Sequence, residues 1–262
     1  MNKESQMSNG KEHMIKAITA DIRYDGRKKD ELRPVSIEYG VSTTADGSAK
    51  ITCGNTEIIV GVSLTLGTPY SDRPDEGTLM VSCELLPIAH PTIESGPPSI
   101  NAIEISRVID RGIRESGAMD VKGLCIEPGV KVWMVSVDVI PINHDGNLID
   151  IGSLGAIAAI TKTLMPKIED GVANYKEKTK NALKLQHTPV PITVCKMGDQ
   201  IFVDPTKEEE QNLDARLTIA VMEDDNICSL QKGGGAGFTS EELKIAFELA
   251  VAKSKEFRKY LA

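Results

Sequence analysis

The stretch NAIEISRVIDRGIRES, residues 101–116, has the pattern of an amphipathic helix, and the fold prediction depends on it more than on any other part of the chain. Wound as a helix, it gathers three arginines at i, i+4 and i+7 into one narrow stripe: Arg107, Arg111 and Arg114. The apolar side chains fall on the opposite face, which can pack on a core: Ile105, Val108, Ile109 and Ile113. Asn101, followed three residues later by Glu104, predicts a capping box at the start of this helix.

Two explanations fit the arginine stripe. The first is a solvated surface held by ion pairs one turn apart, between Asp110 and Arg114 and between Arg111 and Glu115. Each such pair contributes about 0.2–0.5 kcal/mol. The second is a phosphate-binding surface, because guanidinium groups match phosphate oxygens in geometry and charge. The helix alone favours the first explanation, so the rest of the chain has to decide between them.

The composition indicates a protein of the reducing cytoplasm. The chain has 262 residues, enough for one large domain or two small ones. Its net charge of −8 and its 4% aromatic content disfavour general nucleic-acid binding, so any RNA contact must use a local basic patch. Five scattered cysteines without a CxxC pair argue against a disulfide framework or a zinc site: Cys53, Cys83, Cys125, Cys195 and Cys228. The N-terminus is unlike a signal peptide, and no apolar run reaches transmembrane length, so we expect no membrane contact.

The first half of the chain alternates turns with apolar runs. Residues 1–10 are expected to be disordered, and Lys11–Ala20 is expected to form a short helix. Alternating or β-branched runs then predict five strands: Val35–Tyr39, Ala49–Cys53, Glu57–Leu66, Met80–Leu86 and Val130–Ile140. An apolar helix is expected from Asp150 to about Leu164, ended by Pro166.

The second half repeats this order of strands followed by a helix. Residues 167–188 are charged and irregular, and we place the meeting point of the two halves there. Four strands are expected beyond it: Val190–Lys196, Gln200–Asp204, Arg216–Met222 and Asn226–Gln231. The last helix is predicted to follow a capping box between Thr239 and Glu242. The sequence thus predicts an α+β fold with two pseudo-repeated halves, each a β-sheet plus a helix, in a single domain over residues 21–262 after an N-terminal extension over residues 1–20.

Three motifs look functional but have simpler explanations. The glycine run 233–237 lacks the Lys-Ser/Thr of a nucleotide-binding P-loop and is interpreted as a flexible connection. The Gly-Ser-Leu-Gly segment 152–155 could hold an anion at a helix start, yet it offers no cationic side chain and favours tight packing of helix on sheet. The acids of 208–210, with Asp204 and Asp214, could form a carboxylate cluster for Mg²⁺ or acid–base work, but acidic runs are usually solvated. No metal site or cofactor is expected.

Several motifs together resemble those of one enzyme family. The segments DGRKKDELRPVSIEYGV (25–41) and ADGSAKITCGNT (45–56), followed by the arginine helix, resemble the RNase PH family of phosphorolytic 3′→5′ exoribonucleases, and the resemblance covers nearly the whole chain. The segments ELLP (84–87), GPP (96–98) and SVDV (136–139) are most similar to one branch, the non-catalytic RNase PH-like (42-type) subunit of the archaeal exosome. The resemblance implies an RNase PH-like fold.

The chain departs from catalytic members of this family at two places. Those members carry Gly-Gly-Thr-Arg-Thr where this chain has residues 151–155, so Leu154 stands in place of the arginine that grips inorganic phosphate. By the same alignment Arg216 replaces an aspartate that serves as general acid or metal ligand, and Glu210 or Gln211 replaces the preceding acid. Leucine supplies no charge to a phosphate, and arginine cannot act as a general acid near neutral pH. No catalytic residues are therefore expected.

The resemblance implies a non-catalytic ring subunit of the archaeal exosome, which is not an enzyme on its own. It would pair with a catalytic RNase PH-like subunit, alternate with it in a hexameric ring, associate with RNA-binding cap subunits and contact single-stranded RNA. The stripe would bind RNA phosphates through Arg107 and Arg111, whereas Arg114 could bind RNA or pair with Asp110. Two alternatives stay open: a self-sufficient phosphorolytic 3′→5′ exoribonuclease with an altered site, and a structural partner whose arginines do not contact RNA.

Overall fold

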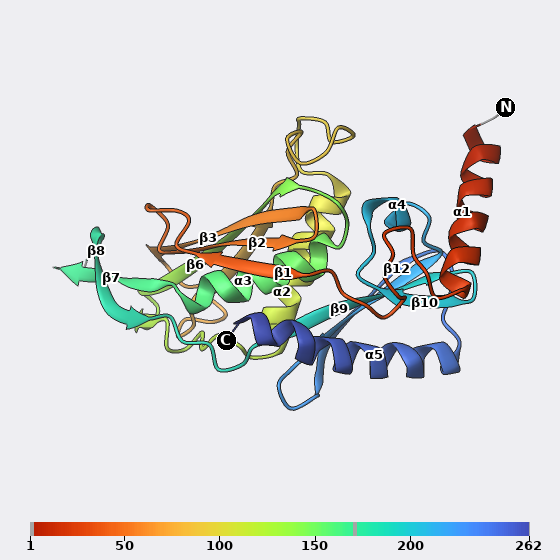
Figure 1. The fold of residues 1–262 in the computed structure, drawn as a ribbon. Helices are drawn as coiled ribbons and strands as arrows, with labels where there is room; N and C mark the ends of the chain where they lie inside the picture. The colour runs from red at the N-terminus through yellow and green to blue at the C-terminus, as the bar shows by residue number, and fades with distance from the viewer. Residues whose placement is uncertain (1–2, 170–171, 262) are drawn as a thin grey trace.

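One layer of the molecule is a six-stranded sheet (Figure 1). The computed structural model describes residues 3–169 and 172–261, and for residues 3–9 and 176 it describes the backbone alone. Five strands follow the order β1-β2-β3-β6-β4, and β5 pairs with β6. Neighbouring strands are antiparallel except β4, which runs parallel to β6. The strands are β1 (Val35–Tyr39), β2 (Gly47–Cys53), β3 (Thr56–Gly67), β4 (Thr78–Cys83), β5 (Cys125–Glu127) and β6 (Lys131–Asn143).

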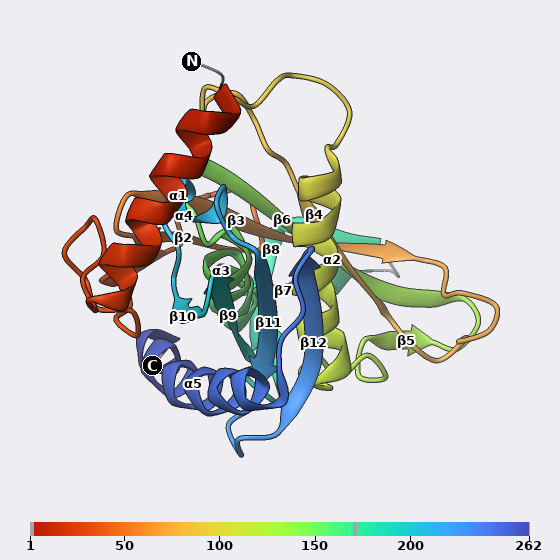
Figure 2. The same ribbon diagram turned by 90° about the vertical axis from the view of Figure 1, so that its right-hand side faces the viewer.

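A second layer is a four-stranded antiparallel sheet in the order β10-β9-β11-β12. Its strands are β9 (Val190–Met197), β10 (Gln200–Val203), β11 (Ala215–Val221) and β12 (Ile227–Gly234). The helix α5 (Ser240–Arg258) packs on β9 and β11 and leads into the 3-10 turn η1 (Lys259–Leu261). Figure 2 shows the helix α2 (Ile100–Glu115) lying beside β12, with which it is in contact. The first and second halves of the chain therefore meet along α2.

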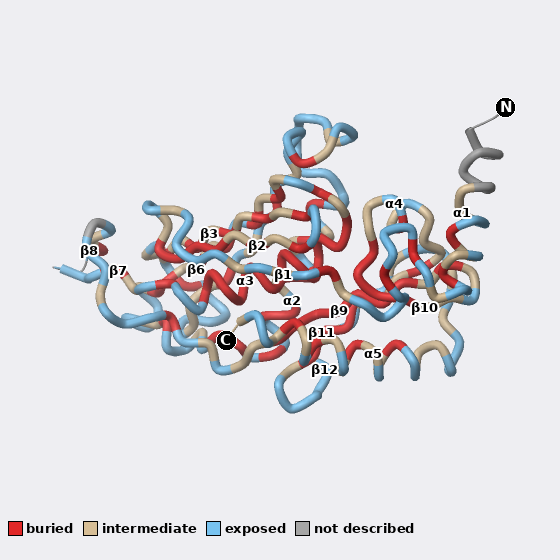
Figure 3. The backbone as a smooth tube through the Cα atoms, in the orientation of Figure 1, coloured by how far each residue is buried: buried red, intermediate tan, exposed pale blue. Residues whose placement is uncertain are grey.

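The helix α3 (Leu148–Thr161) lies between the two sheets, at the centre of the core (Figure 3). It contacts β2 and β3 of one sheet and β9 of the other, and every residue from Leu148 to Ile160 is buried. A helix that is apolar on all sides requires such a position, because no face of it gains from contact with water. The facing strand β3 supplies apolar surface by alternation, with four side chains that are almost wholly buried: Ile58, Val60, Val62 and Leu64.

Two glycines allow α3 to approach the first sheet closely. A Cβ at Gly155 would lie 2.5 Å from Ile51 Cδ1 and 2.8 Å from Val60 Cγ2. A Cβ at Gly152 would lie 3.0 Å from Ile109 Cδ1. The expectation that segment 152–155 serves the packing of helix on sheet is therefore confirmed.

Gly155→Ala is expected to destabilise the chain by about 1–3 kcal/mol, because the added methyl group overpacks a core without space for it. This outcome opposes the helix propensity of alanine, which exceeds that of glycine by about 1 kcal/mol. Urea unfolding monitored by circular dichroism would measure the change. The matched control is Gly10→Ala on helix α1 (Lys3–Thr19), where nothing lies within 4 Å of the added Cβ and no loss of stability is expected. Equal stability of Gly155→Ala and the parent would show that Ile51 and Val60 move aside without cost.

Most elements agree with the sequence predictions. The α+β class is observed, and each predicted strand begins and ends within three residues of the observed one. The predicted capping box of α5 is confirmed, since the Thr239 side chain accepts from the Glu242 N–H and the Glu242 carboxylate accepts from the Thr239 N–H. In the part of the chain that the structure describes, no helix combines the length and apolarity needed to cross a bilayer.

The prediction that residues 1–10 are disordered is wrong for residues 3–10, because α1 begins at Lys3 and extends to Thr19, whereas the predicted helix over Lys11–Ala20 is confirmed as the second half of α1. Its second half is anchored by tertiary packing: Met14 and Ile18 are buried in a small cluster with Phe202 of β10. A segment with no strong helical pattern of its own is thus held by a surface that lies far away in sequence.

Two structural predictions near the meeting point of the halves are also wrong. The helix α3 ends at Thr161, and Pro166 lies in the strand β7 (Leu164–Glu169) rather than at the end of the helix. Much of the segment 167–188, which was expected to be irregular, forms strand β8 (Val172–Ala182) and the end of β7, and the two strands pair as an antiparallel hairpin. This hairpin projects at the end of the molecule opposite α1 (Figure 1). Its charged residues lack the apolar alternation that marks a strand with one buried face.

Candidate nucleic-acid interface

The helix α2 begins one residue earlier than predicted and has a different cap. Ser99 is the N-cap, and its hydroxyl accepts a hydrogen bond from the Ala102 N–H at 3.2 Å. The predicted capping box between Asn101 and Glu104 is wrong, because the Glu104 carboxylate forms an ion pair with Arg216 of β11. The apolar face is as predicted, with four side chains buried against the core: Ile105, Val108, Ile109 and Ile113. The three predicted arginines therefore lie on the outward face.

Arg114 is exposed but already has partners. It forms a bidentate ion pair with Asp110, at 2.7 and 3.0 Å, and donates to the Leu79 carbonyl at 2.9 Å. The hydrogen bonds from Arg114 to Asp110 raise the pKa of the guanidinium against the opposing effect of burial. The solvated-pair explanation of the stripe thus describes this arginine.

Arg107 and Arg111 differ from Arg114 because neither forms an ion pair with a described residue. Arg111 donates to the Gln231 side chain of β12 at 3.2 Å, rather than pairing with Glu115 as the helix spacing allows. Arg107 is exposed and has no hydrogen bond or ion pair within residues 3–169 and 172–261. Two positive charges on α2 are therefore free of intramolecular neutralisation.

A cavity of about 330 Å³ opens where the first half of α2 meets α3 and the short helix α4 (Lys207–Glu210). Its walls carry six hydrogen-bonding or charged side chains among others: Glu104, Asn147, Thr193, Lys207, Glu210 and Arg216. Two of its buried polar atoms have no hydrogen-bond partner in the described part of the chain, namely Nη1 of Arg216 and Oδ1 of Asn147. A buried polar group without a hydrogen bond destabilises the folded protein. The cavity therefore presents hydrogen-bonding capacity that the described part of the protein does not use.

Arg216 connects the second sheet to α2. Its Nη2 lies 2.7 Å from Glu104 Oε2, and the two side chains are 24% and 28% exposed. An ion pair this open to water contributes at most about 1 kcal/mol. Gly233 of β12 lies directly opposite Arg216 in the strand register, and a Cβ there would come within 2.8 Å of the guanidinium carbon. The glycine run therefore begins inside a strand, where it makes room for Arg216, and is not solely the flexible connection that we predicted.

Lys207 is a second cation that lines the cavity, and it contacts His144. Burial, together with the charge of Lys207, lowers the pKa of His144 to about 3, so the imidazole is neutral near pH 7. Its Nε2 lies 2.6 Å from Lys207 Nζ and can accept a hydrogen bond from the ammonium group. Glu210, whose pKa is raised by burial, accepts the Asn147 N–H at 2.7 Å and lies 3.8 Å from Lys207. Lys207 and Arg216 are thus the two cationic groups of the cavity.

The residue aligned with the phosphate-gripping arginine of catalytic relatives lies inside the protein. Leu154 is fully buried in α3 and is not one of the residues that line the cavity. This position therefore presents neither a charge nor a hydrogen bond to a ligand bound there.

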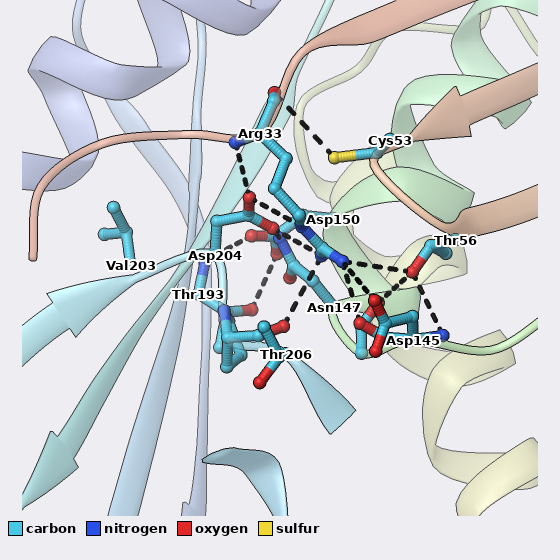
Figure 4. Close-up of polar contacts among 12 residues, drawn as sticks. Arg33, Cys53, Thr56, Asp145, Asn147, Asp150, Thr193, Val203, Asp204 and Thr206 are labelled. Carbon is cyan, nitrogen blue, oxygen red and sulfur yellow. Dashed lines mark hydrogen bonds and ion pairs between the residues drawn. The ribbon is translucent and has the colours of Figure 1, made fainter. Parts of the chain in front are cut away.

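Asp204 is the centre of a buried cluster of polar contacts that includes Arg33 and Asn147 (Figure 4). Arg33 binds its two oxygens at 2.7 and 3.0 Å, and Arg27 donates to it at 2.9 Å. The Asn147 amide adds a hydrogen bond at 2.8 Å. Burial by itself would raise the pKa of Asp204, but the hydrogen bonds and charges of Arg33 and Arg27 outweigh it and lower the pKa. Asp204 is consequently a structural anion and is not free to bind a metal ion.

Other acids of the predicted carboxylate cluster are also engaged. Glu209 forms a bidentate ion pair with the buried Arg23 and closes the capping box of α4 with Thr206. Asp214 pairs with Lys11 of α1 at 2.5 Å. No group of three or more His, Cys, Asp and Glu in the described residues is arranged to hold a metal ion. The acids hold the N-terminal segment against the second sheet, and this arrangement does not favour the catalytic-cluster hypothesis.

Our sequence interpretation missed the arginines of this cluster. Arg23, Arg27 and Arg33 are all buried. Arg23 binds the carbonyl of Val203 at the end of β10, and Arg27 and Arg33 bind Asp204, the next residue. The available signal was the density of arginines in residues 21–34, which is unusual for a plain turn. Their partners follow only from the tertiary fold.

Asp150 of α3 makes stability depend on pH. Its carboxylate accepts the Thr193 hydroxyl at 2.6 Å and the Thr193 N–H at 2.8 Å, and burial raises its pKa from 3.8 to about 7. Because the folded pKa lies above the unfolded one, the folded state holds this proton more tightly. The resulting stabilisation is fully present below the unfolded pKa and is lost as the pH rises through the folded pKa.

Asp150→Asn cannot ionise, so its stability relative to the parent is expected to increase by on the order of 3 kcal/mol between pH 5 and pH 8. Urea unfolding of both chains across this range measures the difference, and other carboxylates cancel because they are common to both. A difference that stays constant from pH 5 to pH 8 would show that Asp150 titrates normally in the folded state.

Comparison with known proteins adds a family and several relatives. Residues 31–166 match the model of the 3′ exoribonuclease family, domain 1, and residues 187–253 match domain 2. The chain is 43% identical over 248 residues to the exosome complex component Rrp42 of Methanopyrus kandleri, covering 94% of this chain and 93% of that protein. It is 41% identical over 256 residues to Rrp42 of Thermococcus kodakarensis, covering 95% and 92%. Its structure superposes with a TM-score of 0.91, at 37% identity, on a chain from the Archaeoglobus fulgidus exosome with RNA bound to the active site, covering 98% of this chain and 99% of that one.

Proposed function

Because the chain belongs to the 3′ exoribonuclease family of RNase PH type, we propose that it is a ring subunit of an archaeal-type exosome that binds RNA without cleaving it. Its catalytic partner would be an RNase PH-like paralogue that alternates with it in a hexameric ring. RNA-binding cap subunits would complete the complex in the cytoplasm. The high coverage of both chains in the comparisons supports a role like that of the relatives.

The observation that carries the RNA-binding role is the pair Arg107 and Arg111. Both are exposed on the outward face of α2, and neither has a carboxylate partner in the described residues. Guanidinium groups bind phosphodiester oxygens without regard to base sequence. Such contacts suit a complex through which RNA of any sequence must pass. Arg114 would contribute less, because binding RNA would require it to give up Asp110 and the Leu79 carbonyl.

The proposal that this subunit does not cleave RNA rests on two positions. Phosphorolysis needs a bound phosphate nucleophile and stabilisation of charge at the leaving oxygen. Leu154 is buried, and its side chain can form neither an ion pair nor a hydrogen bond with a phosphate. Arg216, at the position aligned with an acid, is paired with Glu104 and cannot donate a proton near neutral pH. The acids that a self-sufficient enzyme would use are those of 208–210 and Asp214, and of these Glu209 is paired with the buried Arg23 and Asp214 with Lys11.

Phosphorolysis of a labelled single-stranded RNA, with inorganic phosphate and Mg²⁺ supplied, tests this assignment. We expect no nucleoside diphosphate from the chain alone, and release when it is mixed with a catalytic RNase PH-like paralogue. Release by the chain alone, after removal of contaminating nuclease, would support the self-sufficient enzyme instead. Failure to form a complex with the paralogue would refute the ring-subunit role.

A further inference from the structure

We propose that Arg216 is a further phosphate-binding residue on the RNA path, and that Glu104 both positions it and weakens its hold on RNA. The ligand is one phosphodiester group of single-stranded RNA at the mouth of the cavity between α2 and α4. The inference rests on the proposed function, because it requires RNA to pass along α2. It adds a residue of β11 to a surface that was otherwise confined to one helix.

The geometry places Arg216 in line with the stripe. Its guanidinium contacts Glu104, which lies three residues before Arg107 and seven before Arg111. Residues at these spacings share one face of a helix. Arg216 therefore extends the stripe at the end where α2 borders the cavity, and Figure 2 shows the side-by-side arrangement of α2 and the second sheet that makes this possible.

The resting position of Arg216 is incompletely satisfied. Nη2 has Glu104, but Nη1 is shielded from water and has no partner in the described part of the chain. The pair with Glu104 is partly open to solvent and weak. A phosphodiester has two unbridged oxygens and can accept two parallel N–H bonds from one guanidinium, which Glu104 does not do here. Exchange of Glu104 for a phosphate would therefore satisfy the side chain better than its present contact.

The neighbouring strand has no side chain opposite Arg216, and this leaves space for the guanidinium. Gly233 lies opposite Arg216, and any side chain there would collide with the guanidinium.

The charges around the cavity also matter to an anion. Lys207 and Arg216 are positive, Glu104 is negative, and His144 is neutral near pH 7 because its pKa is lowered to about 3. Glu210 faces the same space and its side chain is 26% exposed, but its carboxylate accepts the Asn147 N–H, whereas the carboxylate of Glu104 contacts Arg216 directly. Glu104 is thus the acid that most directly opposes a phosphate beside Arg216.

The competing explanation is that Glu104 and Arg216 simply tie α2 to β11. The two explanations predict opposite results for Glu104, because a structural tie is lost equally when either partner is removed. If Arg216 binds phosphate, removing Arg216 weakens RNA binding whereas removing Glu104 strengthens it.

The experiment uses the complex with the catalytic paralogue and measures affinity for a single-stranded RNA by anisotropy. Inorganic phosphate is omitted so that the RNA is not degraded. Arg216→Gln is expected to weaken binding about 3- to 30-fold and to reduce the slope of log affinity against log salt by about 0.7, the value for one phosphate contact on a single strand. Glu104→Gln is expected to tighten binding about 2- to 10-fold, because it frees the guanidinium and removes a negative charge. Arg216→Lys keeps the charge and should retain most of the affinity.

Two controls separate the possible failures. Lys255→Gln removes one positive charge from an exposed ion pair on α5 and should leave affinity unchanged. Thermal unfolding checks that the Arg216 and Glu104 variants remain folded. If both of these variants weaken binding, or if neither changes it while the Arg107 and Arg111 variants do, the inference about Arg216 is overturned and the proposed function stands. If the Arg107 and Arg111 variants also bind normally, the proposed function fails with it.

Discussion

Replacing Arg107 and Arg111 together by glutamine should weaken RNA binding by the assembled complex about 30- to 1000-fold. Both guanidinium groups are exposed and lack carboxylate partners in the described residues, so they are available to phosphates. Charge-assisted hydrogen bonds contribute about 1.5–3 kcal/mol each when shielded from water, and contacts between exposed charges contribute less, so we expect a loss of about 2–4 kcal/mol for the pair, which corresponds to this range of affinity. The salt dependence should become shallower by about 1.4, since each phosphate contact on a single strand contributes about 0.7.

The single variant Arg114→Gln provides a matched comparison on the same helix. Because Arg114 is bound to Asp110 and to the Leu79 carbonyl, its loss should affect RNA binding less than the loss of either other arginine. Circular dichroism should show that α2 remains folded in all variants, as these side chains point away from the core. Wild-type affinity and salt slope in the double variant would leave only the purely structural role for this helix.

Asp204→Asn should lower the free energy of unfolding by about 3–5 kcal/mol. The carboxylate is fully buried and neutralises Arg27 and Arg33, which are themselves almost wholly buried. Removing one partner of a buried ion pair leaves the other charge without compensation, and this is far more costly than losing a surface pair. Urea unfolding of the isolated chain would measure the loss.

The pH dependence of the parent offers a second check on Asp204. Its folded pKa is lowered, so its contribution is present above the unfolded pKa and is lost as the pH falls through the folded pKa. Asp204→Asn should therefore unfold with less dependence on acid than the parent does. Asp199→Asn, on the exposed turn between β9 and β10, should behave like the parent throughout. Destabilisation of less than 1 kcal/mol by Asp204→Asn would show that water or another anion neutralises the arginines.

Local patterns predicted the elements whose determinants lie close together in sequence. The capping box of α5 formed as expected, because Thr239 and Glu242 are three residues apart and meet no competing partner that displaces them. The buried face of α2 followed from its helical periodicity. The α+β fold and the resemblance to the RNase PH family are likewise confirmed.

Tertiary competition explains where local patterns failed. Asn101 and Ser99 are both residue types that favour the N-cap position, and the observed N-cap is Ser99. The Glu104 carboxylate binds Arg216, 112 residues away, and therefore does not form the predicted capping box. Periodicity likewise predicted that the three arginines share a face. It could not predict that Arg111 binds Gln231 of β12, because that neighbour is set by the packing of the two halves.

The buried cluster at Asp204 has a consequence for the order in which the chain is made. Arg23 binds Glu209, and these residues are 186 positions apart. Ribosomes add about 5–20 residues per second, so about 10–40 s separate the synthesis of the arginine from that of its acid. During this interval the arginines of the first segment have none of their buried acidic partners. The earliest part of the chain to leave the ribosome is therefore among the last to reach its final position, and a nascent chain stalled before Asp204 would carry these cations without their buried acidic partners.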